Sequence, residues 1–426
     1  MAEHFVAVFE LNEADIAAYG AGSISELIQA LSPATGGGSG RGGGFPVILV
    51  NGVRISSFRE LRSYPPESID KVEVLAAETA QQFGYGPDER VVNIILKRSY
   101  ASREVEGTYG QPWDGGYSNK QAEATYLQIA GQSRINANVS WNDTSVLTEA
   151  ERGVIQSVMP VVAGDPDPAP FRSLIADSAG IEANGNFTTR LGQRTSLSLN
   201  AAFQRNDSLR FQGLDTVQLL GPVQPDGSRD SRLRIFGEDD PLTVDTRSTT
   251  YSLGTTLDTR LGDWQITGTA DANHAVSRSL IERRADVSGL QDAAALGTFG
   301  LDDAIGPLPD AGVDRADSKT DTLTSLVTAV GRPVMLPAGE LALTIDGGYN
   351  FTRIQSEDTR NAGTAIELKR GDLSAGVNLG IPITSRREEF GEEIGDLSLN
   401  LQAGVNHLSD FGTLTDWSVG ANWGIT

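Results

Sequence analysis

The sequence contains no cysteine and no long apolar run, and each absence removes a class of protein. Without cysteine, the chain cannot hold a disulfide framework, a thiolate metal site or a cysteine nucleophile. It has no run of about 18 apolar residues, so the sequence predicts no transmembrane helix. A transmembrane β-barrel would show no such run either, because its strands alternate apolar and polar residues.

Positive charge and histidine are also scarce. The chain has 34 Lys and Arg residues against 56 Asp and Glu residues, which gives a formal net charge of −22. This excess of negative charge argues against a nucleic-acid partner. The three histidines, His4, His274 and His407, are scattered without ligand spacing, so we expect structural or solvated roles for them and no metal site.

Catalytic motifs are missing as well. The acid pairs at 239–240, 388–389 and 392–393 lie in predicted loops, and adjacent side chains point apart, which favours solvated charge over a catalytic dyad. No Gly-x-Ser-x-Gly nucleophile elbow occurs. We therefore expect a protein that is not an enzyme, with no catalytic residues and no cofactor.

From about residue 103 onward, the sequence consists of long segments in which apolar and polar residues alternate. In 397–405, for example, Leu397, Leu399 and Leu401 alternate with small and polar residues. Period two over about ten residues is typical of strands with one apolar and one polar face. The pattern predicts twelve strands, at 103–111, 119–130, 132–146, 181–191, 193–206, 246–261, 263–284, 319–332, 340–356, 364–380, 395–408 and 414–425.

Two features favour a membrane barrel over a soluble sandwich or β-rich enzyme, whose strands would also alternate. A tilted membrane crossing takes about 9–11 residues, which these strands provide. Short turns at 131–132, 192–193 and 262–263 also alternate with long polar connections at about 147–179, 207–244 and 285–318. Short turns at the periplasmic end and long loops outside are typical of outer-membrane barrels.

The faces of such a barrel can be assigned from the alternation. We expect one set of residues to face lipid: Leu341, Leu343, Ile345, Leu397, Leu399, Leu401, Val419 and Ala421. We expect a second set to face the lumen: Thr344, Asn350, Asn400 and Asn422.

The first 100 residues differ in texture and predict a small α+β module. A β-branched run at 47–50 precedes Asn51-Gly52, a strong hairpin signal because both residues tolerate positive φ. Strands are expected at 71–75 and 90–97, and helices at 23–31 and 58–64. Residues 1–20 are expected to form a strand at 5–11 followed by an acidic connection.

This module resembles the plug of TonB-dependent outer-membrane receptors. The resemblance rests on three motifs in the family's order: 50–55 (VNGVRI), 65–75 (PPESIDKVEVL) and 83–97 (FGYGPDERVVNIILK). It implies a plug at 1–100 seated inside a transmembrane antiparallel β-barrel, of which residues 101–426 form a part. It also implies a receptor that lies in the outer membrane, in contact with its lipid and lipopolysaccharide. This receptor would import a scarce siderophore-, vitamin- or carbohydrate-like nutrient, with TonB supplying the energy.

The resemblance also suggests site residues. A glycine-rich stretch at 36–44 is either a flexible loop or the plug loop that rises to touch substrate. The second reading assigns ligand binding at the plug apex to Gly38, Ser39, Gly40, Arg41, Arg54 and Ser56. Plug–barrel contacts are assigned to Arg41, Lys71 and Glu73. Residues 5–10 are either the segment that TonB contacts or the first plug strand.

Twelve strands are about half of the roughly 22 found in plugged transporter barrels. We therefore expect a mainly β receptor whose barrel is incomplete, with strands 103–111 and 414–425 as free edges. Residues 1–9 lack the features of a signal peptide, which an outer-membrane protein needs. The alternative function is a truncated, non-transporting surface protein with a binding or structural role, and the sequence does not name the ligand.

Overall fold

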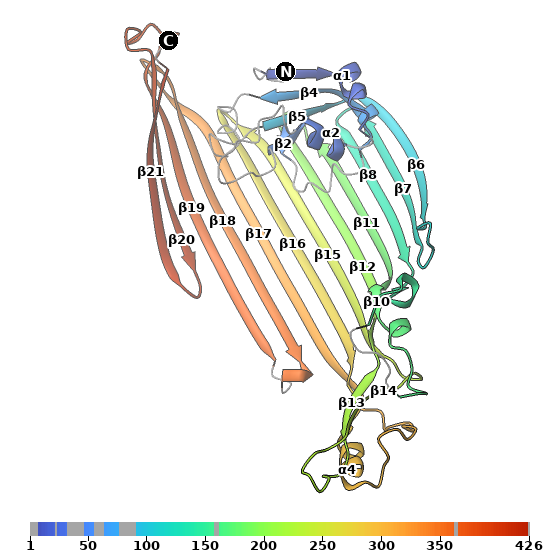
Figure 1. The fold of residues 1–426 in the computed structure, drawn as a ribbon. Coiled ribbons are helices and arrows are strands. Elements are labelled where there is room, and N and C mark those ends of the chain that lie inside the picture. The colour runs from blue at the N-terminus through green and yellow to red at the C-terminus, as the bar shows by residue number, and fades with distance from the viewer. Residues whose placement is uncertain are drawn as a thin grey trace.

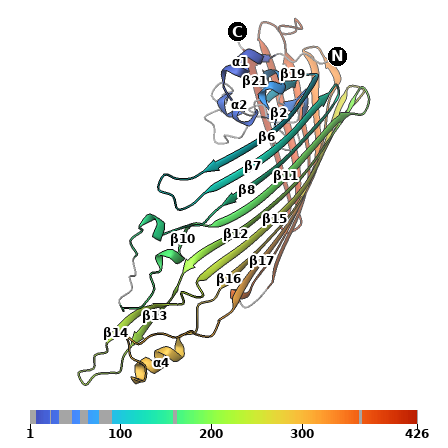
Figure 2. The ribbon, with the colours of Figure 1, turned by 90° about the vertical axis from the view of Figure 1, so that its right-hand side faces the viewer.

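The computed structural model describes residues 7–21, 24–31, 47–54, 64–75, 91–156, 162–361 and 365–424. These residues form an N-terminal module and one large curved sheet, and the module lies within the curve (Figures 1 and 2). None of the helices in these ranges is long and apolar enough to cross a membrane.

Twelve antiparallel strands form the large sheet, and each pairs with its neighbours in chain order. All twelve segments predicted from the alternation are strands, although several run further than expected, as where β12 continues to Gly213. The strands are β6 (Ser99–Gly110), β7 (Asn119–Ala130), β8 (Ser133–Thr144), β11 (Asp177–Arg190), β12 (Thr195–Gly213), β15 (Leu242–Leu261), β16 (Trp264–Glu282), β17 (Val313–Leu336), β18 (Gly339–Asp358), β19 (Ile366–Thr384), β20 (Asp396–Leu408) and β21 (Gly412–Gly424).

The register of these strands separates a polar face from an apolar face. Residues directly opposite each other in a ladder point to the same side of the sheet. One such row runs through Leu127, Asn136, Asn186, Asn200, Gly254, Asp271, Thr324, Asn350 and Asp372. Because Leu127 packs against the module, this is the inner face, and it is predominantly polar.

The outer face carries apolar side chains that no other part of the described chain covers. Exposed examples occur across the sheet: Val105, Val139, Phe187, Leu199, Leu253, Val327, Ile345, Val377, Val405 and Val419. The register also aligns Leu343 with Leu379, Leu401 and Val419 on this face. The predicted division of residues between the two faces is therefore confirmed.

A second, five-stranded sheet forms the core of the N-terminal module. Its strand order is β1-β4-β5-β2-β3. The elements are β1 (Ala7–Asn12), α1 (Glu13–Ala18), α2 (Ile24–Leu31), β2 (Val47–Val50), β3 (Val53–Arg54), β4 (Ile69–Leu75) and β5 (Val91–Leu96). The expected strands and the helix at 23–31 are present, whereas the expected helix at 58–64 lies almost entirely outside the described residues.

Helix α1 corrects the expectation of an irregular acidic connection after the first strand. The side chain of Asn12 accepts hydrogen bonds from the backbone amides of Ala14 and Asp15. The carboxylate of Asp15 in turn accepts from the backbone amide of Asn12, at 3.0 Å. This reciprocal capping satisfies amides that would otherwise be unpaired at a helix start.

The predicted hairpin turn is present, and the sheet holds it in place. Asn51 and Gly52 have φ values of 54° and 76°, the left-handed region that a tight two-residue hairpin requires. The side chain of Asn51 accepts a hydrogen bond from the amide of Leu96, and Asn93 accepts one from the amide of Gly52. The hairpin is thereby fixed to β5.

The module and the large twelve-stranded sheet, called the wall from here on, share one hydrophobic core. Ile24, Leu27 and Ile28 of α2 belong to the same buried cluster as Leu127 and Ile129 of β7. Leu127 is 0% exposed. Since Ala130 ends β7 next to the short turn at 131–132, the module packs at the end of the sheet that carries the short turns.

The opposite end carries the long connections, which are more structured than expected. They contain β9 (Leu147–Thr148), β10 (Ser173–Ile175), β13 (Asp215–Leu220), β14 (Ser231–Phe236) and α4 (Ser288–Leu296). The sorting of loops by length is not strict. The three-residue link 409–411 between β20 and β21 lies at the long-loop end, so the expectation that short turns lie only at the opposite end was wrong there. The eleven-residue link 385–395 between β19 and β20 lies at the short-turn end.

Strands β6 and β21 are the edges of the large sheet, and no pairing joins them within the described residues. The sheet is therefore open, as predicted from the strand number. Its chain ends, N and C, lie at the short-turn end in Figure 1.

Replacing Leu127 by Ala should loosen the module from the wall. The change removes buried methyl groups from the shared core and should cost about 2–5 kcal/mol. Hydrogen exchange of the β4 and β5 amides in detergent should become faster. The control is Val105→Ala on the outer face, 84% exposed, which should leave the exchange unchanged. Equal exchange in the two variants would contradict a shared core.

Candidate functional site

The inner face is hollowed near the middle of the sheet, where β11, β12, β15, β16 and β17 lie side by side. The hollow has a volume of about 230 Å³. Polar side chains surround it: Asn184, Asn186, Asn200, Ser252, Asp271, Asn273, Thr322 and Thr324. The hollow lies on the face that the module packs against, and Asn200, Gly254 and Asp271 share a ladder row with Leu127.

A glycine creates the room for this hollow. Gly254 lies opposite Asn200 on one side and Asp271 on the other. A Cβ atom at Gly254 would meet both the Asp271 carboxylate and the Asn200 amide. The missing side chain therefore lets these two polar groups approach each other over the β15 backbone.

Among the described residues, Asp271 is the only charged one that lines the hollow. Its carboxylate has no hydrogen-bond or ion-pair partner within the described ranges. Nearby, the Ser252 hydroxyl donates to the Asn273 side chain at 2.8 Å. The hollow thus presents amides, hydroxyls and one carboxylate, a set that can both donate and accept hydrogen bonds.

The rest of the inner face carries further carboxylates and cations. Carboxylates occupy the middle of the wall at Glu104, Glu106, Glu123, Glu182, Asp346 and Asp416. On the inner positions of the twelve strands, cations lie toward strand ends, at Arg134, Arg190, Arg210, Arg260 and Arg370. The middle of the wall is therefore negative.

Most of the site residues suggested by the plug resemblance lie outside the described residues. Gly38, Ser39, Gly40, Arg41 and Ser56 are outside the described residues, and Arg54 belongs to β3 without a described side chain. Their proposed contact with ligand stays a prediction.

The other two residues, Lys71 and Glu73, are paired within the module. The Lys71 ammonium lies 2.6 Å from Glu73 and 3.4 Å from Glu10. The Glu73 carboxylate also accepts a hydrogen bond from Asn93. These bonds hold β1, β4 and β5 together. The role of Lys71 and Glu73 in contacting the wall stays a prediction.

A loop subdomain at the other end was missed from the sequence. It consists of β13, β14, α4 and the segments 162–176 and 283–312. Val217 and Leu219 on β13, Phe236 on β14 and Ala294 on α4 form its buried core. The alternation in 215–220 and 231–236 was the available signal, but both lie inside a stretch that appears polar as a whole.

A buried ion pair ties this subdomain together. Arg234 and Asp165 have side chains 3% and 4% exposed, with a nitrogen–oxygen distance of 2.8 Å. Arg234 also donates to the backbone carbonyls of Leu301 and Asp303, each at 2.8 Å. Asp165 accepts from the amide of Ile235. One guanidinium therefore joins three separate interstrand loops, 145–176, 214–241 and 283–312.

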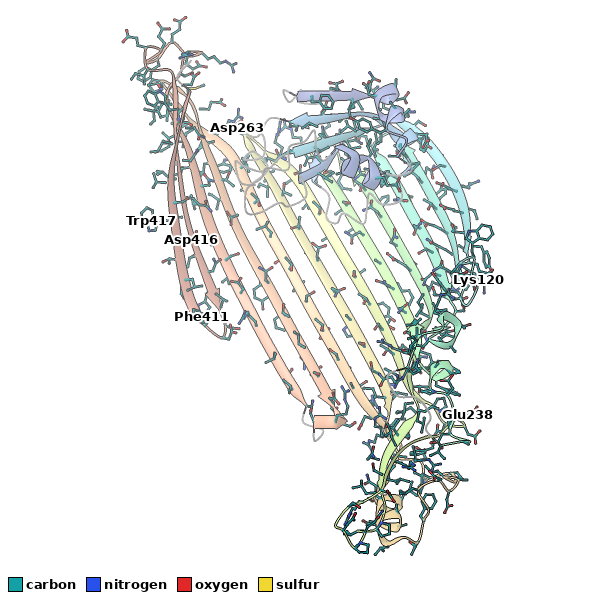
Figure 3. The ribbon with its side chains drawn as sticks, in the orientation of Figure 1. Lys120, Glu238, Asp263, Phe411, Asp416 and Trp417 are labelled. Carbon is teal, nitrogen blue, oxygen red and sulfur yellow. The ribbon has the colours of Figure 1, made fainter. Side chains whose placement is uncertain are left out.

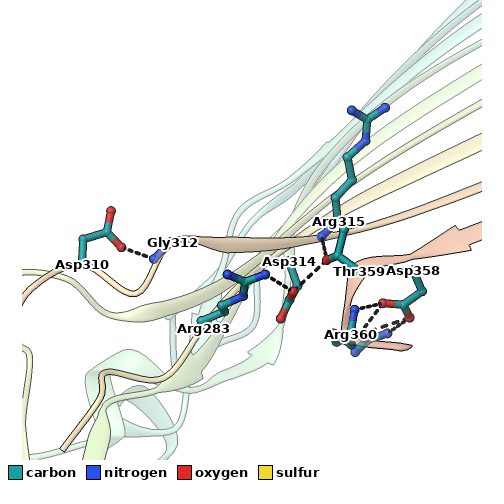
Figure 4. A network of polar contacts seen from close by, with 8 residues as sticks. All are labelled: Arg283, Asp310, Gly312, Asp314, Arg315, Asp358, Thr359 and Arg360. Carbon is teal, nitrogen blue, oxygen red and sulfur yellow. Dashed lines mark hydrogen bonds and ion pairs between the residues drawn. The ribbon is translucent and has the colours of Figure 1, made fainter. Parts of the chain in front are cut away.

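Figure 4 shows a second polar network, where the subdomain joins the ends of β17 and β18. Asp314 accepts from Arg283 at 2.6 Å and from the Thr359 hydroxyl at 2.7 Å. Asp314 lies at the loop end of β17, next to the loop subdomain. The hydrogen bond from Arg283 is the main cause that holds the pKa of Asp314 below its usual value, and the bond from Thr359 adds to it. The described residues contain no group of three or more His, Asp or Glu side chains that could hold a metal ion.

A scan of protein-family models gives no match, and neither does a search of curated proteins. Solved structures do show similarity. A variant of the ferric enterobactin receptor PfeA of Pseudomonas aeruginosa is similar over 100% of this chain and 60% of its own, with 14% identity and a TM-score of 0.47. The siderophore receptor PirA of Acinetobacter baumannii matches over the same shares, with 13% identity and a TM-score of 0.46.

A third similar structure is the RagAB peptide importer, which matches over 99% of this chain and 57% of its own. Its sequence identity is 10% and its TM-score 0.44. The chain thus spans about 60% of the length of the receptor structures that it matches.

Substituting Asp165 by Asn should destabilise the loop subdomain by about 3–5 kcal/mol, because the Arg234 charge would remain buried without its counter-ion. Proteolysis within 214–241 and 283–312 should become faster while the large sheet stays intact. The matched control is Arg232→Met. It breaks the Arg232–Asp302 pair, whose side chains are 43% and 65% exposed, and should change stability by less than about 1 kcal/mol. Similar proteolysis of both variants would contradict this assignment.

Proposed function

We propose that the chain is part of an outer-membrane receptor that binds a scarce small-molecule nutrient outside the cell and admits it past a plug. One observation carries this proposal: a folded module packs against the polar face of a sheet whose opposite face is apolar and uncovered. A soluble protein rarely exposes so continuous an apolar surface.

The outer face has the features of a surface in lipid. Its apolar side chains alternate with inward polar ones along each strand, the pattern of transmembrane barrels. Strands of 19–24 residues, such as β16 and β17, exceed the roughly 9–11 residues of a tilted crossing. Their remaining length extends beyond the bilayer at the loop end.

The place where the bilayer ends is marked by a change of side chains on β12, β15 and β16. Phe203 and Tyr251 have ring centroids 5.2 Å apart, and the ring of Tyr251 stacks on that of His274. Beyond this aromatic group, Asp207 pairs with both Arg205 and Arg247 on the same face. Aromatic residues favour membrane interfaces, and charges in the next rows suit contact with lipopolysaccharide headgroups.

The module is proposed as the plug, and TonB as the source of energy for its displacement. The motifs at 65–75 and 83–97 support this, because they contain β4 and β5, whose Val72 and Ile94 belong to the shared core. Import rather than catalysis is the proposed activity. The alternative is a surface protein that binds its ligand without importing it.

Uptake by intact cells separates these two functions. Cells with and without the gene would be given fluorescent oligosaccharide, cobalamin and ferric siderophore probes, with and without a protonophore. We expect one probe to enter only in cells that carry the gene and only while the membrane is energised. Surface binding that a protonophore does not alter, without entry, would support the alternative and contradict import.

Spin labels at neighbouring residues should report opposite environments. The chain has no cysteine, so one introduced cysteine carries the only label. Labels at Ile345 and Val419 should be reached by oxygen dissolved in lipid. Labels at Thr344 and Asn400 should be reached by a water-soluble nickel chelate, because adjacent strand residues point to opposite faces. A mixed response within either pair would contradict the assigned faces.

A further inference from the structure

We propose that the hollow centred on Asp271 is a binding site for a hydroxyl-rich ligand that carries a cationic group, as an amino sugar does. The inference rests on the proposed receptor function and adds the chemical class of its ligand. The site lies on the polar inner face of the sheet, the face that the module packs against.

The lining favours hydroxyl groups on the ligand. The Asn184 and Asn186 amide nitrogens donate to Asn138 and Ser198, and each has a second amide hydrogen beyond that bond. Thr322 and Thr324 offer hydroxyls that can donate or accept, and the Ser252 hydroxyl, which donates to Asn273, can still accept. Among the described residues, no aromatic side chain lines the hollow, so they offer no surface for stacking a planar ligand.

The volume sets the size of the group that is recognised. About 230 Å³ is below the roughly 300–1,000 Å³ of sites that enclose drug-sized ligands. The hollow is therefore suited to one ring or one short branch of a ligand rather than to a large chelate.

The charge favours a positive group over a negative one. Asp271 is the one ionisable residue in the lining, and Gly254 leaves its carboxylate lying beside Asn200. A partly buried carboxylate without a partner gains from a ligand ammonium, because hydrogen bonds between charged groups are stronger than those between neutral groups. The carboxylates in the middle of the wall, including Glu182 and Asp346, extend the negative potential on both sides.

The wall offers matched controls for both features. Asp416 on β21 lies over Gly404 as Asp271 lies over Gly254, but it is outside the hollow. Gly420 is likewise on the inner face, yet a Cβ there would meet nothing within 4 Å. Asp416→Asn and Gly420→Ala therefore reproduce the chemical changes without altering the proposed site.

Binding would be measured by calorimetry on the full chain in detergent, with three probes: a glucosamine trimer, a maltotriose and a galacturonate trimer. We expect the cationic trimer to bind most tightly and the anionic trimer most weakly. Asp271→Asn should weaken the cationic trimer by about tenfold, the worth of one charged hydrogen bond. Its effect on maltotriose should be smaller. Gly254→Ala should weaken the binding of both the glucosamine trimer and maltotriose. The controls Asp416→Asn and Gly420→Ala should leave the binding of both probes unchanged.

Three results would overturn the inference. These are tighter binding of the galacturonate trimer, equal losses in Asp271→Asn and Asp416→Asn, or no saturable binding of the cationic trimer. All three leave the receptor function standing if the labelled residues still divide between lipid and water. If the spin labels failed to divide between lipid and water while the glucosamine trimer bound at Asp271, the receptor function would be contradicted and the binding site would still be supported.

Discussion

The structure depends on the pairing of backbone amide and carbonyl groups across twelve strands. In hydrocarbon, no water is present to satisfy an unpaired group, so each one costs several kcal/mol. The continuous ladder from β6 to β21 gives every interior strand a hydrogen-bonded neighbour on both sides. The outer edges of β6 and β21 are subject to the same requirement, and in a bilayer they need further strands as partners.

The ladder also fixes which side chains can act together. Because register places Asn200, Gly254 and Asp271 side by side, a chemical site forms from residues on three neighbouring strands. The same register turns Leu253 and its neighbours outward, where they are exposed. A shift of one residue in any strand would exchange the two faces, so the apolar surface and the polar wall are specified together. The N-terminal module adds to this constraint by packing on Leu127 and Ile129.

The large strands could be predicted because their signal is local. Alternation along one segment records which side chains share a face of the sheet, and the residues from Leu397 to Leu401 showed it without reference to any other strand. The hairpin at Asn51-Gly52 was predictable for the same reason, since its positive φ values belong to two residues. Helix α1 had a local signal too, in the Asn12 and Asp15 cap, but its short apolar pattern concealed it.

The candidate sites could not be predicted in this way. Arg234 and Asp165 are separated by 69 residues, and nothing near either residue indicates its partner. The hollow requires the register of five strands, and alternation specifies only which face each residue occupies. Asp271 appears in the sequence as one acid among many. Its meaning depends on Gly254, whose missing side chain is informative only once the two strands are paired.

The central claim is that the sheet crosses the outer membrane with its loop subdomain outside and its short turns inside. Figure 3 shows Glu238 and Asp263, two exposed residues at opposite ends of the strands. Cysteine introduced at each position would be treated with a membrane-impermeant maleimide in intact cells. The account predicts that Glu238→Cys reacts at once, whereas Asp263→Cys reacts only after the outer membrane is permeabilised. Equal labelling of both in intact cells, or labelling of Asp263→Cys alone, would contradict it.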